Sequence, residues 1–187
     1  MTATMPRVLA LDAALARCAA AIIEGERPLA WRQQDVVGGH SALLATMVQQ
    51  VLAASGRTAA ELDLVAVTVG PGGFTGIRAA LALAHGIGLA AGIPVVGVTV
   101  GEALAAALPD LGRRCLWTAT DSRRGRVFLE RRAGVSAFTL DALPDPDGPI
   151  TLAGDAAVMV APRLTAHGCD VTLADVCQPG PQHVALA

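Results

Sequence analysis

A glycine-rich segment, Gly70-Pro71-Gly72-Gly73-Phe74-Thr75-Gly76, has the residue types that could bind an anion. It follows an apolar run and opens a helical pattern, and exposed N–H groups at a helix start can hold a phosphate. The spacing does not fit the dinucleotide fingerprint, because Thr75 stands where the third glycine belongs. All 14 basic residues are Arg, so neither a P-loop lysine nor a Schiff base can form. Anion binding and a purely structural turn both stay open.

The other residues with chemical potential are scattered. The four histidines, His40, His85, His167 and His183, show no spacing typical of a metal site. His40 beside Ser41 could form half of a nucleophile pair or mark the start of a helix. Asp12, at the end of an apolar strand, could touch a metal or a phosphate or could simply belong to a turn. No C-x-x-C pair occurs among the cysteines. The histidines and cysteines therefore predict no metal site, and the roles of Asp12 and His40 stay open.

Two apolar helices stand out among the elements that would position any site. The helix predicted over 75–91 has a small-residue stripe, Gly76, Ala80, Ala84 and Gly88, and it is apolar nearly all round, so it must be covered on more than one side. The helix predicted over 41–55 has no charged residue, and its wide apolar face includes Leu44, Met47, Val48 and Val51. Together the helices could dock a partner protein. Burial against the chain's own sheet is the alternative.

Arginines concentrate in one part of the sequence. Seven of the 14 lie between residues 113 and 132, against only Asp121 and Glu130. Three of them, Arg123, Arg124 and Arg126, belong to a predicted hairpin that could face RNA. A solvated surface without a nucleic-acid role is the alternative.

The element order predicts an α/β protein in two lobes. Short apolar strands over 8–11, 18–24 and 29–36 form an antiparallel meander, and helices and strands alternate after it. Beyond Pro109 an abbreviated version of this pattern begins again. We expect an N-terminal lobe over 1–108 and a smaller second lobe over 109–187. The start of the chain lacks the apolar core of a signal peptide, and the apolar run 79–91 is too short for a membrane span, which predicts a cytoplasmic protein without a membrane partner.

Several motifs together resemble the TsaB (YeaZ) family, the non-catalytic paralogues in bacterial tRNA threonylcarbamoyladenosine synthesis. The resemblance covers most of the chain and is strongest over 8–104. It rests on Leu9-Ala10-Leu11-Asp12, on His40-Ser41, on the glycine-rich segment continued through Ile77-Arg78, on Ile93-Pro94-Val95-Val96-Gly97-Val98 and on Glu102-Ala103-Leu104.

The resemblance implies an actin/Hsp70-like (ribonuclease H-like) fold. It also implies a scaffold or activator subunit of the complex that transfers threonylcarbamoyl to the adenosine beside the anticodon. The partners would be a TsaD-like catalytic paralogue and a TsaE-like ATPase, which would hold the ATP and the metal, with tRNA contacted indirectly and a homodimer also open. The expected partner-binding residues are Leu44, Met47, Val48, Val51, Gly72, Gly73, Phe74, Thr75, Gly76, Arg78, Ala80 and Ala84.

The same resemblance argues against catalysis by this chain. The two metal-binding histidines of the catalytic paralogue correspond to Val100 and Leu104, and aliphatic side chains cannot bind a metal. Asp12 is followed by Ala13 rather than by the family's threonine, which weakens a phosphate site. The chain also lacks a tail usual in the family after its abbreviated second lobe. The alternative function is an independent nucleotide-binding enzyme or a peptidase of the same superfamily.

Overall fold

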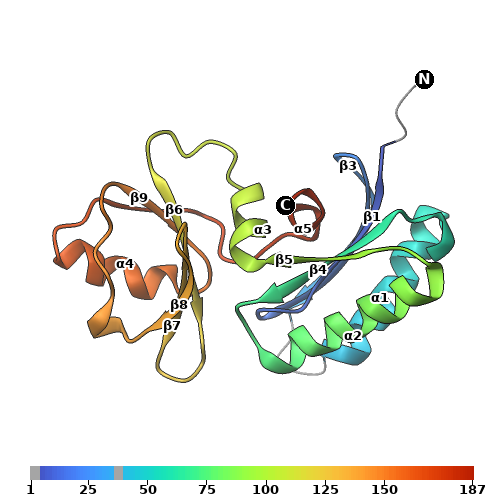
Figure 1. Ribbon diagram of the computed structural model, residues 1–187, viewed down its shortest axis with the longest axis horizontal. Helices are drawn as coiled ribbons and strands as arrows, with labels where there is room; N and C mark the ends of the chain where they lie inside the picture. Colours follow the sequence, from blue (N-terminus) through green and yellow to red (C-terminus); the bar gives the residue numbers. More distant parts are fainter. Residues whose placement is uncertain (1–4, 36–39) are drawn as a thin grey trace.

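The computed structural model describes residues 5–35 and 40–187, with the backbone alone for 40–42, and consists of two lobes (Figure 1). Each lobe is built on a five-stranded sheet. The possible roles of the His40 and Ser41 side chains lie outside what the structure describes. The two-lobed α/β architecture expected from the element order is confirmed.

The first-lobe sheet has the order β3-β2-β1-β4-β5. The strands β1 (Arg7–Asp12), β2 (Arg17–Glu24) and β3 (Arg27–Asp35) form the expected antiparallel meander. The strands β4 (Leu64–Gly70) and β5 (Val95–Thr99) continue the sheet in parallel with β1. Both faces of this sheet are covered, which explains why β1 and β4 are nearly continuous apolar runs.

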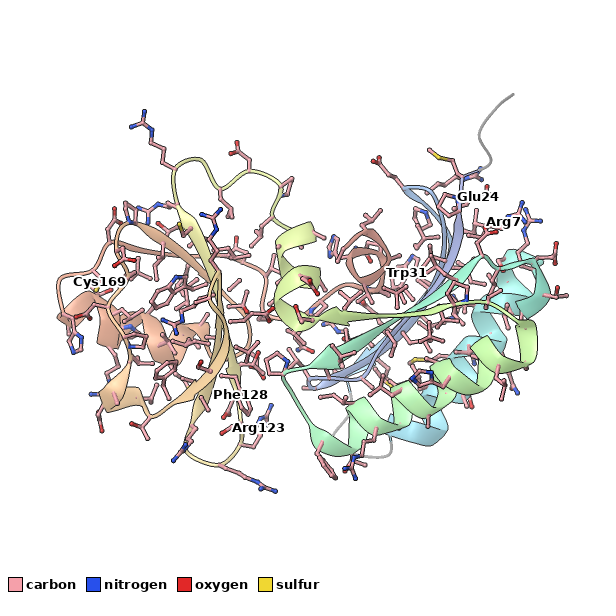
Figure 2. All side chains as sticks on the ribbon, in the orientation of Figure 1. Arg7, Glu24, Trp31, Arg123, Phe128 and Cys169 are labelled. Carbon is pink, nitrogen blue, oxygen red and sulfur yellow. The ribbon has the colours of Figure 1, made fainter. Side chains whose placement is uncertain are left out.

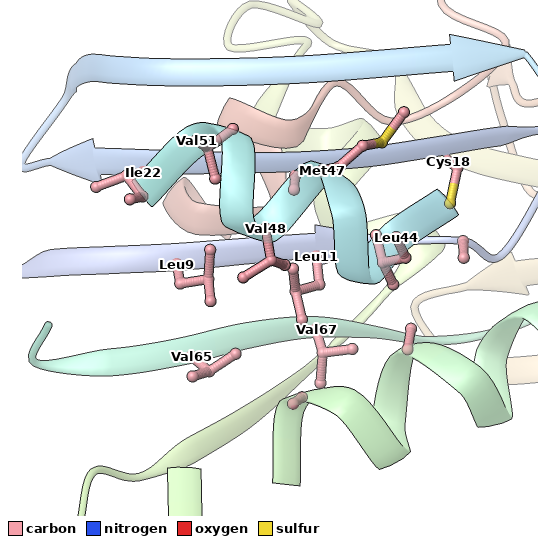
Figure 3. Packing of buried hydrophobic residues seen from close by; sticks show 14 of the residues in the cluster. Leu9, Leu11, Cys18, Ile22, Leu44, Met47, Val48, Val51, Val65 and Val67 are labelled. Atoms are coloured by element: carbon pink, nitrogen blue, oxygen red, sulfur yellow. The ribbon is translucent and has the colours of Figure 1, made fainter. Parts of the chain in front are cut away.

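The two long helices cover one face of that sheet and lie side by side (Figure 1). They are α1 (His40–Ser55) and α2 (Phe74–Ala91), and the short 3₁₀ helix η1 (Ala59–Glu61) adjoins α2. Figure 3 shows side chains of α1 packed on those of the strands beneath it. This core includes Leu9, Leu11, Ile22, Val65 and Val67 from the sheet.

The opposite face is covered by two short helices, α3 (Val100–Ala106) and α5 (Pro181–Leu186). Val184 of α5 is buried with Val8, Ala10 and Ala66 in a core of the first lobe. The predicted second lobe over 109–187 is therefore wrong at its end: the chain returns to the first lobe over α5. The physical reason is that β1 is apolar on both faces, and α5 buries the face that is turned away from α1 and α2.

The second-lobe sheet has the order β10-β9-β6-β7-β8. Its strands are β6 (Cys115–Asp121), β7 (Val127–Arg131), β8 (Gly134–Phe138), β9 (Ile150–Ala153) and β10 (Val171–Leu173), and η2 (Leu140–Ala142) precedes β9. Helix α4 (Ala157–Ala166) covers one face. Ala156 is the N-cap residue of α4 and forms no side-chain hydrogen bond there. The carboxylate of the preceding residue, Asp155, accepts a hydrogen bond from the N–H of Asp121.

Candidate docking surface

The glycine-rich turn packs on the loop that follows β1. The Gly73 N–H donates a 2.6 Å hydrogen bond to the carbonyl oxygen of Ala14. A Cβ atom at Gly72 would overlap that same oxygen, and one at Gly76 would overlap the carbonyl oxygen of Ala13. Both positions therefore need glycine because two backbone segments touch there. Of the two interpretations of this turn, its contacts support the structural one.

Asp12 belongs to the same arrangement. Its carboxylate is buried, and Oδ1 accepts hydrogen bonds from the Thr68 hydroxyl at 2.6 Å and from the Ala14 N–H at 3.0 Å. The side chain thus fixes the loop after β1 against β4. Burial, with a smaller contribution from the nearby Asp12 charge, raises the pKa of the Cys18 thiol to about 11. Of the two roles open to Asp12, these contacts support the turn role.

Seven residues expected to meet a partner are instead buried in the chain's own core. Figure 3 shows the α1 members facing the strands of the sheet. No more than 5% of any of the six apolar side chains is exposed, and Gly76 is buried as well. The corrected residues are Leu44, Met47, Val48, Val51, Gly76, Ala80 and Ala84. In α2 the small residues Gly76, Ala80 and Ala84 let the helix approach its own sheet closely. Burial against that sheet was the alternative explanation of the small-residue stripe.

The outer side of α2 presents a different set of apolar residues. Leu89 is 88% exposed and Phe74 is 65% exposed. The Arg78 guanidinium stacks on the Phe74 ring at 3.7 Å from its centroid, one helical turn further along. Gly73 and Thr75, also among the expected partner residues, are exposed as well, and Gly72 is half-buried.

A shallow apolar groove of about 460 Å³ runs along α2 beside η1. Its lining consists of small and aliphatic residues: Ala59, Ala60, Ala82, Leu83, Gly86, Ile87, Ala90 and Ala91. The outward positions of α1, such as Gln49, Gln50 and Ala53, are uncharged. The outer face of α1, α2 and η1 is named here the docking face. Sequence reasoning missed its groove residues, although their spacing along α2 opposite the buried stripe was a usable signal.

Length and apolar composition alone would let α2 span a membrane. Its stripe packs on the first-lobe sheet, however, and core helices of globular proteins pass the same test. We therefore treat the exposed apolar side of α2 as a protein surface. Contiguous apolar surface of this kind is typical of interaction sites.

The positions that the sequence comparison paired with metal-binding histidines are buried between the lobes. Val100 and Leu104 pack with Ala14, Leu15 and Ala153, the last from β9 of the second lobe. The cluster is aliphatic and leaves no polar group at either position. In the part of the chain that the structure describes, no group of three or more His, Cys, Asp or Glu side chains is arranged to hold a metal ion.

The seven arginines between residues 113 and 132 form two groups, one at each end of β6 and β7. Arg123, Arg124 and Arg126 lie at the turn between β6 and β7, where Figure 2 labels Arg123. Arg113, Arg114, Arg131 and Arg132 lie at the other end of the same two strands. The single basic patch that the sequence suggested is therefore two separate ones.

Only some of these arginines are available to a partner. Arg123 has a positive φ of 57°, and its guanidinium lies within 3.7 Å of the carboxylates of Asp121 and Asp155. Burial raises the pKa of Asp155, and the Asp121 N–H and the Arg123 charge oppose that shift. Arg124 and Arg126 are exposed and form no ion pair with a described residue.

Comparison with known proteins relates the chain to one family model and to several curated proteins. The family model described as tRNA N6-adenosine threonylcarbamoyltransferase (TsaD) matches residues 35–143. The tRNA threonylcarbamoyladenosine biosynthesis protein TsaB of Escherichia coli K12 is 30% identical over 128 residues, which are 65% of this chain and 53% of that protein. An uncharacterized protein of Mycobacterium tuberculosis H37Rv is 34% identical over 79% of this chain and 71% of its own. The chain thus spans about half of the E. coli relative.

Solved structures show the same fold. YeaZ from Pseudomonas aeruginosa superposes with a TM-score of 0.79 at 22% sequence identity, over 97% of this chain and 90% of that one. The actin-like class expected from the sequence is therefore confirmed. The family match covers more than half of the chain, and the motifs that carry it lie in the turn and strands described above. The chain belongs to the TsaB (YeaZ) family within the TsaD superfamily.

Proposed function

We propose that this chain is a non-catalytic scaffold or activator subunit in the synthesis of threonylcarbamoyladenosine in tRNA. It docks a TsaD-like catalytic paralogue through the docking face, and that paralogue transfers threonylcarbamoyl to the adenosine beside the anticodon. One observation carries the proposal: the outer side of α1 and α2 is almost uncharged, contains an apolar groove and exposes the side chains of Phe74 and Leu89. Interface cores are depleted of charge in this way and enriched in aromatic residues and Arg.

The interior of the molecule supports a non-catalytic role. The buried aliphatic pair Val100 and Leu104 offers no ligand atom to a metal. Asp12 is engaged by Thr68 and by the backbone of the loop it organises. Chemistry, ATP and metal would then belong to the TsaD-like subunit and to a TsaE-like ATPase, and the assembly would work in the cytoplasm.

Phe74 and Arg78 are the proposed centre of the contact. The stacked pair stands at the start of α2 and offers one aromatic and one charged side chain. Tyr, Trp and Arg dominate the binding energy of most interfaces, and Arg78 is the one arginine on the docking face. The exposed backbone of Gly73 and Thr75 beside it would extend the contact. A second copy of this chain could use the same face in the absence of the paralogue.

RNA contact is a smaller part of the proposal. Arg124 and Arg126 are exposed and, unlike Arg123, form no ion pair with a described residue, so they are the two residues that would approach tRNA in the assembled complex. Each such phosphate contact adds a salt-dependent contribution to binding.

The test mixes this protein with the TsaD homologue of the same genome and measures complex mass and affinity. Leu89→Arg and Ala82→Glu place charges on exposed positions of the docking face and should weaken association at least about tenfold. Val158→Arg on α4 is the matched control, because Val158 is 68% exposed on the other lobe. Equal affinity of all three variants and the unmodified protein would refute docking through this face.

A functional arm uses the same variants. The reconstituted complex should lose tRNA modification with Leu89→Arg and keep it with Val158→Arg. Hydrolysis of ATP or of a peptide by the isolated chain would favour the independent-enzyme alternative over the scaffold.

A further inference from the structure

A cavity of about 390 Å³ opens at one end of the second-lobe sheet. It lies where β6 and β9 begin and β7 ends, opposite to the hairpin turn. One wall is formed by the loop 146–149, and the sheet contributes Leu116, Trp117 and Ile150. No residue of the docking face lines it, so its role is independent of the proposed docking.

Three arginines, Arg113, Arg131 and Arg132, line this cavity. None of the three forms an ion pair with a described residue, whereas the neighbouring Arg114 is bonded to the Asp170 carboxylate and to the Ile150 carbonyl. Asp147 is the one acidic residue of the lining. Three cationic groups against a single carboxylate leave the cavity with a residual double positive charge.

Arg131 is held in place by aromatic rings. Its guanidinium carbon lies 5.3 Å from the centroids of both Trp117 and Phe138. Its Nε–H is buried and has no hydrogen-bond acceptor among the residues that the structure describes. A buried donor on a charged group is costly to leave without a partner, and a bound ion is one of the few explanations for such a group.

We propose that this cavity binds a phosphate monoester. A phosphate dianion matches the residual charge, and its oxygens suit the forked donors of arginine. Arg131, held against the two rings, supplies the preorganised donor, while the exposed side chains of Arg113 and Arg132 close over the anion. Leu116, Trp117 and Pro149 offer an apolar wall for the organic part of the ligand.

Tryptophan fluorescence provides a direct readout. The chain has two tryptophans, and Trp31 lies on β3 of the other lobe, so Trp31→Phe leaves Trp117 as the sole reporter beside the cavity. Inorganic phosphate and phenyl phosphate are titrated into this variant at constant ionic strength. We expect a saturable change of Trp117 emission in the millimolar range or below.

A pair of double variants separates the cavity from general charge. Arg113→Gln with Arg132→Gln should weaken phenyl phosphate binding at least about tenfold. Both side chains are exposed, so this change spares the core. Arg27→Gln with Arg32→Gln removes the same charge from exposed positions of β3 in the other lobe and should leave binding unchanged. Absence of saturation, or equal weakening by both double variants, would overturn the proposal.

The same titration distinguishes the two sources of a phosphate monoester. A short RNA with a 5′-phosphate is compared with the same RNA carrying a 5′-hydroxyl. Tighter binding of the phosphorylated RNA than of phenyl phosphate assigns the cavity to an RNA end. Tighter binding of phenyl phosphate supports a small phosphorylated molecule. Equal binding of both RNAs, with none of phenyl phosphate, would refute a monoester site.

Discussion

The N–H of Gly101, in the first turn of α3 in the first lobe, donates a 2.9 Å hydrogen bond to Oε2 of Glu130 on β7 of the second lobe. The hydroxyl of Thr99 donates to Oε1 of the same carboxylate at 2.5 Å. A Cβ atom at residue 101 would overlap this carboxylate. Glycine at 101 therefore lets one acidic side chain join the two lobes at the positive end of a helix.

Gly101→Ala should weaken the joint between the lobes. The added methyl group must displace the Glu130 carboxylate, and we expect this to lower the unfolding free energy by about 1–3 kcal/mol. Urea denaturation followed by circular dichroism measures the unfolding free energy. Gly86→Ala is the control, since a Cβ there meets nothing and alanine favours a helix by about 1 kcal/mol. A Gly101→Ala protein as stable as the Gly86→Ala protein would contradict the joint.

The orientation of α2 can be tested with two alanines that lie two residues apart. Ala84→Leu inserts three carbons into the core between α2 and the sheet and should cost about 1–3 kcal/mol. Ala82→Leu, on the exposed side of the same helix, should stay within about 0.5 kcal/mol of the unmodified protein. Thermal unfolding of both variants checks this. Equal destabilisation by both substitutions would mean that the helix is turned differently.

The raised pKa of Asp155 predicts a pH dependence of stability. Burial is the main cause of the rise, so the folded chain holds this proton more tightly than the unfolded chain does. The contribution of Asp155 to the unfolding free energy therefore falls as the pH rises from the ordinary value for Asp to the raised one. Asp155→Asn does not ionise, so its stability relative to the unmodified protein should increase over that interval. A difference that is constant with pH would show that burial does not shift this carboxyl.

The four thiols should react in a fixed order. Cys115 and Cys177 are exposed and should react with a thiol reagent first at mildly alkaline pH. Burial and the Asp145 carboxylate raise the pKa of Cys169, which should slow it. Cys18 is fully buried, with its pKa near 11, and should react only after unfolding. Time-resolved thiol counts with and without urea test the order, and rapid loss of all four thiols in the folded protein would contradict it.

The sequence alone located nearly every helix and strand of this protein. The period of the apolar residues, the glycines and the prolines are local signals, and local signals suffice for elements such as β1, α2 and the hairpin of β6 and β7. The glycine-rich turn and the two aliphatic residues Val100 and Leu104 also placed the chain in its family and argued against a metal site. These inferences needed residue types and order only.

The tertiary structure decided which side of each helix faces outward. Helix α2 is apolar nearly all round, so its sequence fits two orientations equally well. The close approach of Gly76 to the Ala13 carbonyl selects the one that buries Ala80 and Ala84 and exposes Leu89. The return of α5 to the first lobe and the division of the arginines into two groups were equally invisible in the sequence. Both depend on which distant segments the sheets bring together, and a linear pattern carries no information about distances of that kind.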